Sequence, residues 1–444
     1  MDLPATNYVI VGRKVSSEEG VIINEKRSEE VRPRFLAMTH YRHADTGSQW
    51  DVATRPGDTV DIIPWFVRDG ELHVVARSEF PRPITQARGI DRPADDVAIS
   101  GYIPEPISVV VADGRTIEET VVSTLAIRAH IERDAVLSVE DGPSSMPSPG
   151  ATAERVRVVF VGIAPPPQGF EVAVSYDDIP EHRIKEFSVS QLIRAYKSGG
   201  MVDVRLEIAA YALLERLARS RGPWIEQVIA LPEQTEQRAV VSVSWEEIGK
   251  RLTRQTFTPI TAAAPSYVAF MNGTFSEYSS AHKELRTWER EYIVPRHSST
   301  NTVTVVLVTK TADGWYIAVE ESHLAPVQAL TGSSGILTVP AWRLPKRMHG
   351  VAATRRFIED AMRKQFSTEI SDLLPLGGSY YPSAGLSPEY VMPFIAYVPG
   401  ADTTKLTWIP LSDLFAHRDE LLDGHLLVSL WRTLHMISDM AVRE

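Results

Sequence analysis

One loop sequence occurs twice in the chain, and this repeat constrains the fold more than any other feature. Residues 146–156 and 381–391 share Pro, Ser, Gly and Glu in the spacing Pro-Ser-x-Gly-x-x-x-Glu, and each copy leads directly into an apolar, β-like stretch. The two prolines (382 − 147) and the two glutamates (389 − 154) are both 235 positions apart. A fixed offset over so specific a pattern indicates two copies of one domain rather than chance similarity.

Other parts of the two halves match in the same order. Asp69-Gly70 and Asp313-Gly314 each lie between two β-branched runs, which predicts a tight β-hairpin in each half. Asp203 and Asp423, which are 220 positions apart (423 − 203), each precede an apolar helical pattern. The repeat therefore extends over most of the chain.

A chain of 444 residues is long for one hydrophobic core and natural for two domains. We predict a first domain of residues 1–222 and a second of residues 223–444. The boundary falls at Gly222-Pro223, because proline cannot continue the helical pattern that precedes it.

Composition and charge exclude several kinds of site and partner. The absence of cysteine rules out disulfides, thiolate metal sites and a cysteine nucleophile. A formal net charge of −11 argues against broad nucleic-acid binding, although a local arginine pocket can still bind a small anion. No apolar run reaches ~18 residues and no signal peptide begins the chain, so we expect a cytoplasmic protein without a membrane partner.

Hydrophobic periodicity predicts an α/β fold with a β-rich segment at residues 7–67. Thr116 can cap a helix that we expect to run to about Arg133, with Glu118 and Glu119 in its first turn. Further helices are expected at residues 188–197 and 206–219, where apolar residues recur three to four apart, and at residues 351–366 as the equivalent helix of the second half. Residues 411–422 and 426–440 are expected to close the second domain.

A hairpin, an extended Glu105-Pro106 segment, a helix after Gly114 and the repeated loop before a strand together resemble the Nudix superfamily, most closely its ADP-ribose pyrophosphatase branch. The resemblance covers nearly the whole chain, once per half. It implies two tandem α/β/α sandwich domains with mixed sheets, each with an N-terminal β-rich extension. Members of this branch are usually homodimers whose extension reaches the partner's site, so the tandem chain is expected to form that dimer internally.

The glutamates of the Nudix motif line a helix and bind Mg²⁺ or Mn²⁺, which activate a water for attack on a diphosphate. In the first half Gly114, Arg128 and Glu132 match the motif. Three of its acidic positions are Thr120, Ala129 and Arg133. One acid beside an arginine is a poor divalent site, so we expect no metal dependence in this half.

In the second half Arg355, Glu359 and Asp360 match the motif. With Glu389 from the loop, the two helix acids could hold one Mg²⁺ or Mn²⁺ weakly and act as the catalytic residues. The alternative is a surface acidic pair that partners Arg356 or Arg363 at helical spacing.

The resemblance and the repeated loop also suggest ligand-binding residues. In the second half these are Arg355, Tyr380, Tyr381, Ser383 and Gly385, and in the first half they are Arg128, Glu132, Ser148, Gly150 and Glu154. The two tyrosines could stack on a base or sugar, or belong to the core. The resemblance implies an arginine after the hairpin, for which the first half offers Arg77. Arg82, Arg88 and Arg92 in the nearby loop could replace it as phosphate or carboxylate partners, or form a solvated loop.

These features leave three hypotheses. The first is a protein that binds a nucleoside-diphosphate-type ligand and has largely lost Nudix hydrolysis. The second is an active hydrolase or biosynthetic enzyme that works through the C-terminal domain on ADP-ribose or a nucleotide sugar. The third is a structural partner protein, and further homo-oligomers are compatible with each. An enzyme requires Glu359, Asp360 and Glu389 to converge on one ion.

Overall fold

The computed structural model describes most of both halves of the chain. The described residues are 6–10, 22–29, 35–79, 103–111, 114–176, 179–199, 203–221, 243–261, 267–278, 284–346, 348, 350–370, 372–398 and 405–441. The expected boundary at Gly222-Pro223 and the arginines at 82, 88 and 92 lie outside these residues. Within them, no helix combines the length and hydropathy that crossing a membrane requires.

The first half contains a mixed sheet with the strand order β11-β12-β6-β5-β10-β9, in which β5 (Thr59–Arg68) and β10 (Val156–Ile163) are parallel. The predicted hairpin is present: Asp69 and Gly70 both have positive φ, as a type I′ turn requires. The other strands of this sheet are β6 (Glu71–Glu79), β7 (Ile103–Glu105), β8 (Ile107–Val110), β9 (Val136–Ser145), β11 (Glu171–Tyr176) and β12 (Ile179–Ser188).

Helices cover both faces of this sheet. α1 (Ile117–Ala129) packs Val121 and Leu125 on one face, while α2 (Val189–Ser198) and α3 (Val204–Arg221) cover the other. Thr116 caps α1, as expected, and the Glu119 side chain completes a capping box with it. It ends at Ala129 rather than near Arg133, because His130 adopts a left-handed conformation that closes the last turn.

The second half repeats the central part of this order, because β17-β16-β21-β20 corresponds to β6-β5-β10-β9. Its sheet runs β18-β17-β16-β21-β20, again with a parallel central pair, β16 (Asn301–Thr311) and β21 (Tyr390–Tyr397). Helix α6 (Val351–Phe366) packs on one face and α8 (Gly424–Ala441) on the other. The remaining elements are β17 (Gly314–His323), β18 (Gly335–Thr338), β19 (Ala341–Arg343), β20 (Asp372–Pro375), β22 (Thr407–Pro410), α4 (Trp245–Leu252), α5 (Ala325–Thr331) and α7 (Leu411–Ala416).

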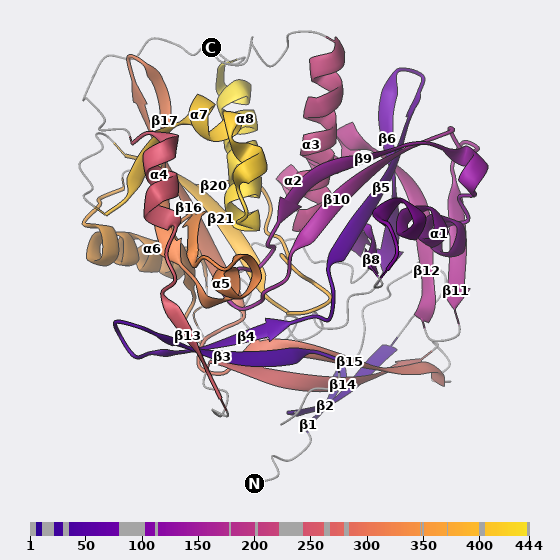
Figure 1. The fold of residues 1–444 in the computed structure, drawn as a ribbon, viewed down its shortest axis with the longest axis horizontal. Coiled ribbons are helices and arrows are strands. Elements are labelled where there is room, and N and C mark those ends of the chain that lie inside the picture. Colours follow the sequence, from indigo (N-terminus) through magenta and orange to yellow (C-terminus); the bar gives the residue numbers. More distant parts are fainter. Residues whose placement is uncertain are drawn as a thin grey trace.

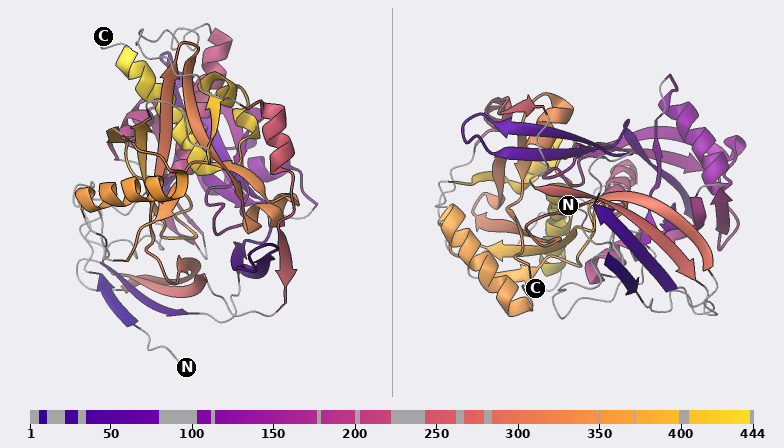
Figure 2. Two further views of the ribbon diagram at one scale, coloured as in Figure 1. Left: turned by 90° about the vertical axis from the view of Figure 1, so that its left-hand side faces the viewer. Right: turned by 90° about the horizontal axis from the view of Figure 1, so that it is seen from below.

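Two small sheets combine strands from both halves. One has the order β1-β2-β14-β15, and the other has the order β13-β3-β4. Figure 1 shows them below the two large sheets, and the view from below in Figure 2 shows them crossing both halves. Their strands are β1 (Thr6–Ile10), β2 (Ile22–Glu29), β3 (Ala37–His43), β4 (Gln49–Thr54), β13 (Phe257–Ile260), β14 (Val268–Tyr278) and β15 (Glu284–Pro295).

Contacts between the halves are reciprocal. Helices α3 and α8 lie side by side between the large sheets, and the rings of Tyr211 and Trp431, 220 positions apart, stack on each other. Met146 forms an isolated bridge with Asp423, and Tyr381, 235 positions after Met146, forms one with Asp203. An approximate twofold axis between α3 and α8 accounts for this pattern. The observed architecture is therefore a mixed α/β fold with two halves of matching strand order.

Candidate functional site

The two copies of the repeated loop bind each other. The Ser148 hydroxyl donates a 2.7 Å hydrogen bond to Glu389, and the Ser383 hydroxyl donates a 3.1 Å hydrogen bond to Glu154. All four side chains are buried. The serine and glutamate of each loop are thus partners of the glutamate and serine of the other, which explains why these positions recur together.

Glu389 is surrounded by groups that stabilise its charge. Thr302 donates a hydrogen bond of 2.8 Å, and the Arg343 guanidinium lies 3.2 Å away. Burial alone would raise the pKa of this carboxyl. Arg343, His425 and the hydroxyls of Ser148 and Thr302 outweigh it and lower the pKa of Glu389 below its ordinary value.

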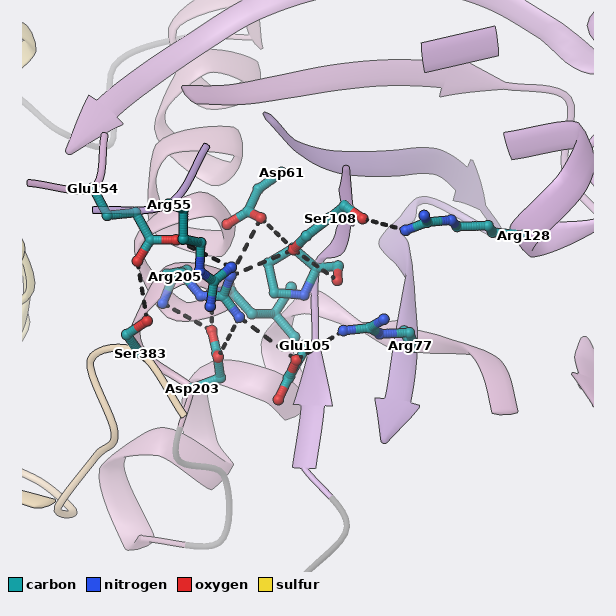
Figure 3. A network of polar contacts seen from close by, with 12 residues as sticks. Arg55, Asp61, Arg77, Glu105, Ser108, Arg128, Glu154, Asp203, Arg205 and Ser383 are labelled. Atoms are coloured by element: carbon teal, nitrogen blue, oxygen red, sulfur yellow. Dashed lines mark hydrogen bonds and ion pairs between the residues drawn. The ribbon is translucent and has the colours of Figure 1, made fainter. Parts of the chain in front are cut away.

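Glu154 belongs to a larger charged network in the first half, shown in Figure 3. Arg55 lies 3.3 Å from Glu154, and Figure 3 shows both beside the buried side chain of Arg205. The Arg205 guanidinium lies 3.0 Å from Asp203, 3.4 Å from Asp61 and 3.6 Å from Glu105.

Each member of this network comes from a different element. Asp61 lies on β5 and Glu105 on β7, where Arg77 of β6 contacts it at 3.1 Å. Asp203 precedes α3 and accepts hydrogen bonds from the backbone N–H groups of Arg205 and Leu206, which are otherwise unpaired at a helix start. The capping of α3 by Asp203 therefore positions Arg205 within the network.

Some buried polar atoms of this network lack a hydrogen-bond partner among the described residues. Burial raises the pKa of Asp61, although Arg205 and the Ser108 hydroxyl oppose this. Asp61 Oδ2 and Arg205 Nε have no hydrogen-bond partner among the described residues. Buried polar atoms without partners are rare in proteins and are typical of a site that also holds water or a ligand.

A pocket of about 420 Å³ adjoins the network at Arg55. The repeated loop contributes Gly385 and Leu386, and a Cβ at Gly385 would lie 3.7 Å from the Arg55 guanidinium. The other lining residues come from the extension strands of both halves and the segments next to them: Phe35, Leu36, Asn272, Glu289, Arg290 and Glu291.

This pocket offers an aromatic ring and a second cation. Phe35 is 54% exposed, and Arg290 has no carboxylate partner among the described residues. Glu291 accepts hydrogen bonds from the backbone N–H groups of Phe35 and Leu36 at 2.7 and 2.9 Å. The pocket thus has two guanidinium groups, an exposed ring and two acids, Glu289 and Glu291. Of these acids, Glu291 is hydrogen-bonded to backbone N–H groups.

The three expected catalytic acids do not form one cluster in the structure. Asp360 is exposed and lies 3.3 Å from Arg363, three positions along α6, and Glu359 is half-buried. Glu389 is bound to Ser148, Thr302 and Arg343, as described above. Across the described residues, no group of three or more His, Cys, Asp or Glu side chains is arranged to hold a metal ion.

Several expected ligand-binding residues have other surroundings. Tyr380 and Tyr381 are fully buried in the core, and the Tyr380 hydroxyl lies 3.0 Å from His425. Arg355 donates to the Leu373 carbonyl. Gly150 lies exposed at the tip of the first loop, and of the expected set only Gly385 lines the pocket.

The structure also places the matching motif residues of the two halves at different points along their helices. Leu125 and Met362 are structural counterparts, since each carbonyl accepts the N–H group that closes its helix, from Ile131 and Thr368. Arg128 therefore lies in the last turn of its helix, where it donates to the Ser108 carbonyl, whereas Arg355 lies in the second turn of α6. The exposed Glu132 lies beyond α1 because the helix ends early.

Sequence reasoning missed Asp61 and Arg205. Each interrupts an apolar pattern: Asp61 follows Val60 and precedes two isoleucines, and Arg205 lies between Val204 and Leu206. A charge within a buried pattern is the signal that could have identified them, because ionised groups are almost never buried without partners.

The geometry defines a two-part α/β protein with a buried charged network beside a pocket between its halves. No protein-family model matches the chain, and no curated protein is significantly similar to it.

Proposed function

We propose that this protein binds a nucleoside-diphosphate-type ligand, and that its two halves are Nudix-like domains in which metal-dependent hydrolysis is largely lost. The observation that carries the proposal is the pocket at Arg55, which combines two guanidinium groups with an exposed aromatic ring. The matching strand orders and the extension strands that cross between the halves support the tandem arrangement.

The pocket chemistry suits the parts of such a ligand. Guanidinium groups form paired, charge-assisted hydrogen bonds with phosphate oxygens, which assigns the diphosphate to Arg55 and Arg290. An aromatic face stacks on a nucleobase, which assigns the base to Phe35. A volume of about 420 Å³ falls within the range of small-molecule sites.

The proposed loss of hydrolysis follows from the surroundings of the acids. A divalent ion needs several oxygens converging from one scaffold, and water completes the coordination of Mg²⁺. Glu389 and Glu154 are each engaged by an arginine and by a serine of the opposite loop. Using either glutamate for a metal would take a buried carboxylate away from the arginine and the serine that stabilise its charge, at high cost.

Calorimetric titration with ADP, ADP-ribose and adenosine tests the proposal. We expect the diphosphates to bind with or without Mg²⁺ and adenosine to bind far more weakly. Arg290→Ala should lower diphosphate affinity about tenfold or more, because it removes a charge-assisted contact. The matched control is Arg183→Ala, an exposed arginine on β12 paired with Glu171, which should leave the affinity unchanged.

Phosphate release from ADP-ribose separates the binding protein from the hydrolase. We expect no turnover, or slow turnover with Mn²⁺. Brisk Mg²⁺-dependent turnover that Glu359→Gln abolishes would establish the enzyme instead. Equal affinity for adenosine and ADP would overturn the assignment of the guanidinium groups.

A further inference from the structure

A second cavity, of about 280 Å³, lies between the two halves near α3 and α8. Its apolar wall consists of Ile208, Ala212, Leu427 and Trp431, together with Phe160 of β10. It shares no lining residue with the pocket at Arg55. The cavity is therefore a separate feature of the interface between the halves.

An irregularity in β9 shapes one side of this cavity. The pairing of β9 with β10 shifts register between Arg157 and Val159, and Gly142 and Pro143 occupy the bulge. A Cβ at Gly142 would lie 2.7 Å from the Phe160 ring, so a side chain at this position would displace the cavity wall. Bulges of this kind are frequent beside functional sites.

The counterpart of this cavity across the approximate twofold is filled by the protein itself. The offset of 220 positions that relates Asp203 to Asp423 also relates Ala212 to Arg432 and Leu427 to Glu207. The buried Arg432 guanidinium forms two hydrogen bonds with Glu207, of 2.7 and 2.8 Å. The same group donates to backbone carbonyls of the turn at residues 376–378, which corresponds to the bulge at Gly142.

Three carboxylates near the cavity form ion pairs, whereas a fourth has no ion-pair partner in the described part of the chain. Arg418 pairs with Glu215 at 2.6 Å and Arg216 pairs with Glu140 at 2.6 Å. Asp141 pairs with Arg157 at 2.6 Å. Asp419, exposed at the rim, has no ion-pair partner in the described part of the chain. The cavity therefore has an apolar wall and a surplus negative charge.

We propose that this cavity binds a small organic cation with an alkyl stem and a guanidinium or ammonium head. The stem packs against the apolar side chains of Trp431 and Leu427. The head takes the place of the Arg432 guanidinium, near the backbone of the β9 bulge, and Asp419 balances its charge. Arg216 already donates to one carbonyl there, that of Asp141, so the head uses the remaining acceptors.

Titration calorimetry of the full chain with butylguanidine and butylurea tests this inference. The two probes have nearly the same shape, and only butylguanidine is charged. We expect butylguanidine to bind with one site per chain and butylurea to bind at least about tenfold more weakly. Asp419→Asn should weaken butylguanidine binding about two- to fivefold, because solvent screens an exposed carboxylate, while leaving butylurea unchanged.

A variant can also close the site with the protein's own counterpart residues. Ala212→Arg combined with Leu427→Glu installs the arginine–glutamate pair and should abolish butylguanidine binding. If that variant does not fold, Ala212→Met fills the cavity without charge and should have the same effect. Arg290→Ala, which alters only the other pocket, should leave butylguanidine binding unchanged.

Three results would overturn the inference. Butylurea could bind as tightly as butylguanidine, butylguanidine could fail to bind at millimolar concentration, or a variant filled at position 212 could bind it undiminished. Because ADP and butylguanidine report on different pockets, failure at one site is distinguishable from failure at the other.

Discussion

At the scale of single residues, the glutamates of the repeated loops act as buried anchors between the halves. Glu154 and Glu389 each accept a hydrogen bond from the opposite serine and face an arginine. Charge-assisted hydrogen bonds of this kind are about twice as strong as neutral ones. The interaction between the loops therefore depends on both glutamates being ionised.

Glu389→Gln should lower the free energy of unfolding at pH 7 by about 2 kcal/mol, because charge-assisted contacts are lost. The folded-state pKa of Glu389 lies below its ordinary value of 4.5. Its stabilising effect is therefore complete above that pH and is lost as the pH falls through the folded-state value. Urea unfolding between pH 7 and pH 3 should show the difference from wild type shrinking with acid.

The matched control is Glu359→Gln on α6, because Glu359 is half-buried and forms no ion pair with the residues that the structure describes. We expect a change within about 0.5 kcal/mol at every pH. A difference for Glu389→Gln that stays constant down to pH 3 would contradict the role given to its charge.

The sequence identified Glu154, Glu389, Ser148 and Ser383 as site residues, but it did not show that each serine bonds to the glutamate of the other loop. The spacing within each loop is local and visible, whereas the hydrogen bonds join residues 241 and 229 positions apart. Only the packing of the two halves decides which serine meets which glutamate. For the same reason the sequence left open whether Tyr380 and Tyr381 bind a ligand or belong to the core, because their burial depends on packing against the other half.

At the scale of elements, the repeat predicted α6 with its observed bounds, Val351–Phe366, as the counterpart of α1, and its buried positions recur every four residues. Periodicity missed the short helices α4 and α5, which have few turns in which a period can show. It also placed the end of α1 too late, since the left-handed turn at His130 has no glycine to mark it.

Close backbone contact holds α4 against β18. A Cβ at Gly335 would lie 2.0 Å from the Leu252 carbonyl oxygen, so Gly335→Ala should destabilise the protein by about 1–3 kcal/mol through overpacking. Gly249→Ala, within α4 and with open space around its Cβ, should instead stabilise it by about 0.5–1 kcal/mol. Thermal unfolding of both variants checks the prediction, and equal effects would refute it.

The extension strands are fixed by a second reciprocal pair. Asp51 accepts hydrogen bonds from the N–H groups of Tyr267 and Val268, as Glu291 does from those of Phe35 and Leu36. Asp51→Asn should weaken the first pair and speed amide hydrogen exchange at residues 267–268 and in β15. Asp45→Asn, in the exposed turn before β4, is the control. Unchanged exchange in the Asp51 variant would show that the carboxylate does not hold this edge.

At the scale of the whole molecule, neither half has a complete set of contacts. β13 pairs with β3 and β14 with β2, so each small sheet needs both halves. Two buried ion pairs, Glu207–Arg432 and Glu215–Arg418, also join them. The family resemblance implied that the two halves associate, but it did not indicate which residues join them.

Residues 1–222 and 223–444 expressed separately should therefore fold poorly, because each leaves charged groups and strand edges without partners. Co-expression should restore a stable complex with the cooperative unfolding of the intact chain. Circular dichroism and size-exclusion chromatography provide the measurement. Two soluble halves that unfold cooperatively and do not associate would show that the shared sheets are dispensable.

Ala212 and Arg432 occupy related positions in the two halves, and their difference shows that mutation can alter one half without the other. In a symmetric dimer of identical chains, one codon specifies both copies of a position, so any mutation alters two sites at once. Here the related positions are encoded separately, and one has an arginine while the other has an alanine. Joining both halves in one chain thus allows one cavity to be filled by an arginine–glutamate pair while its counterpart stays open.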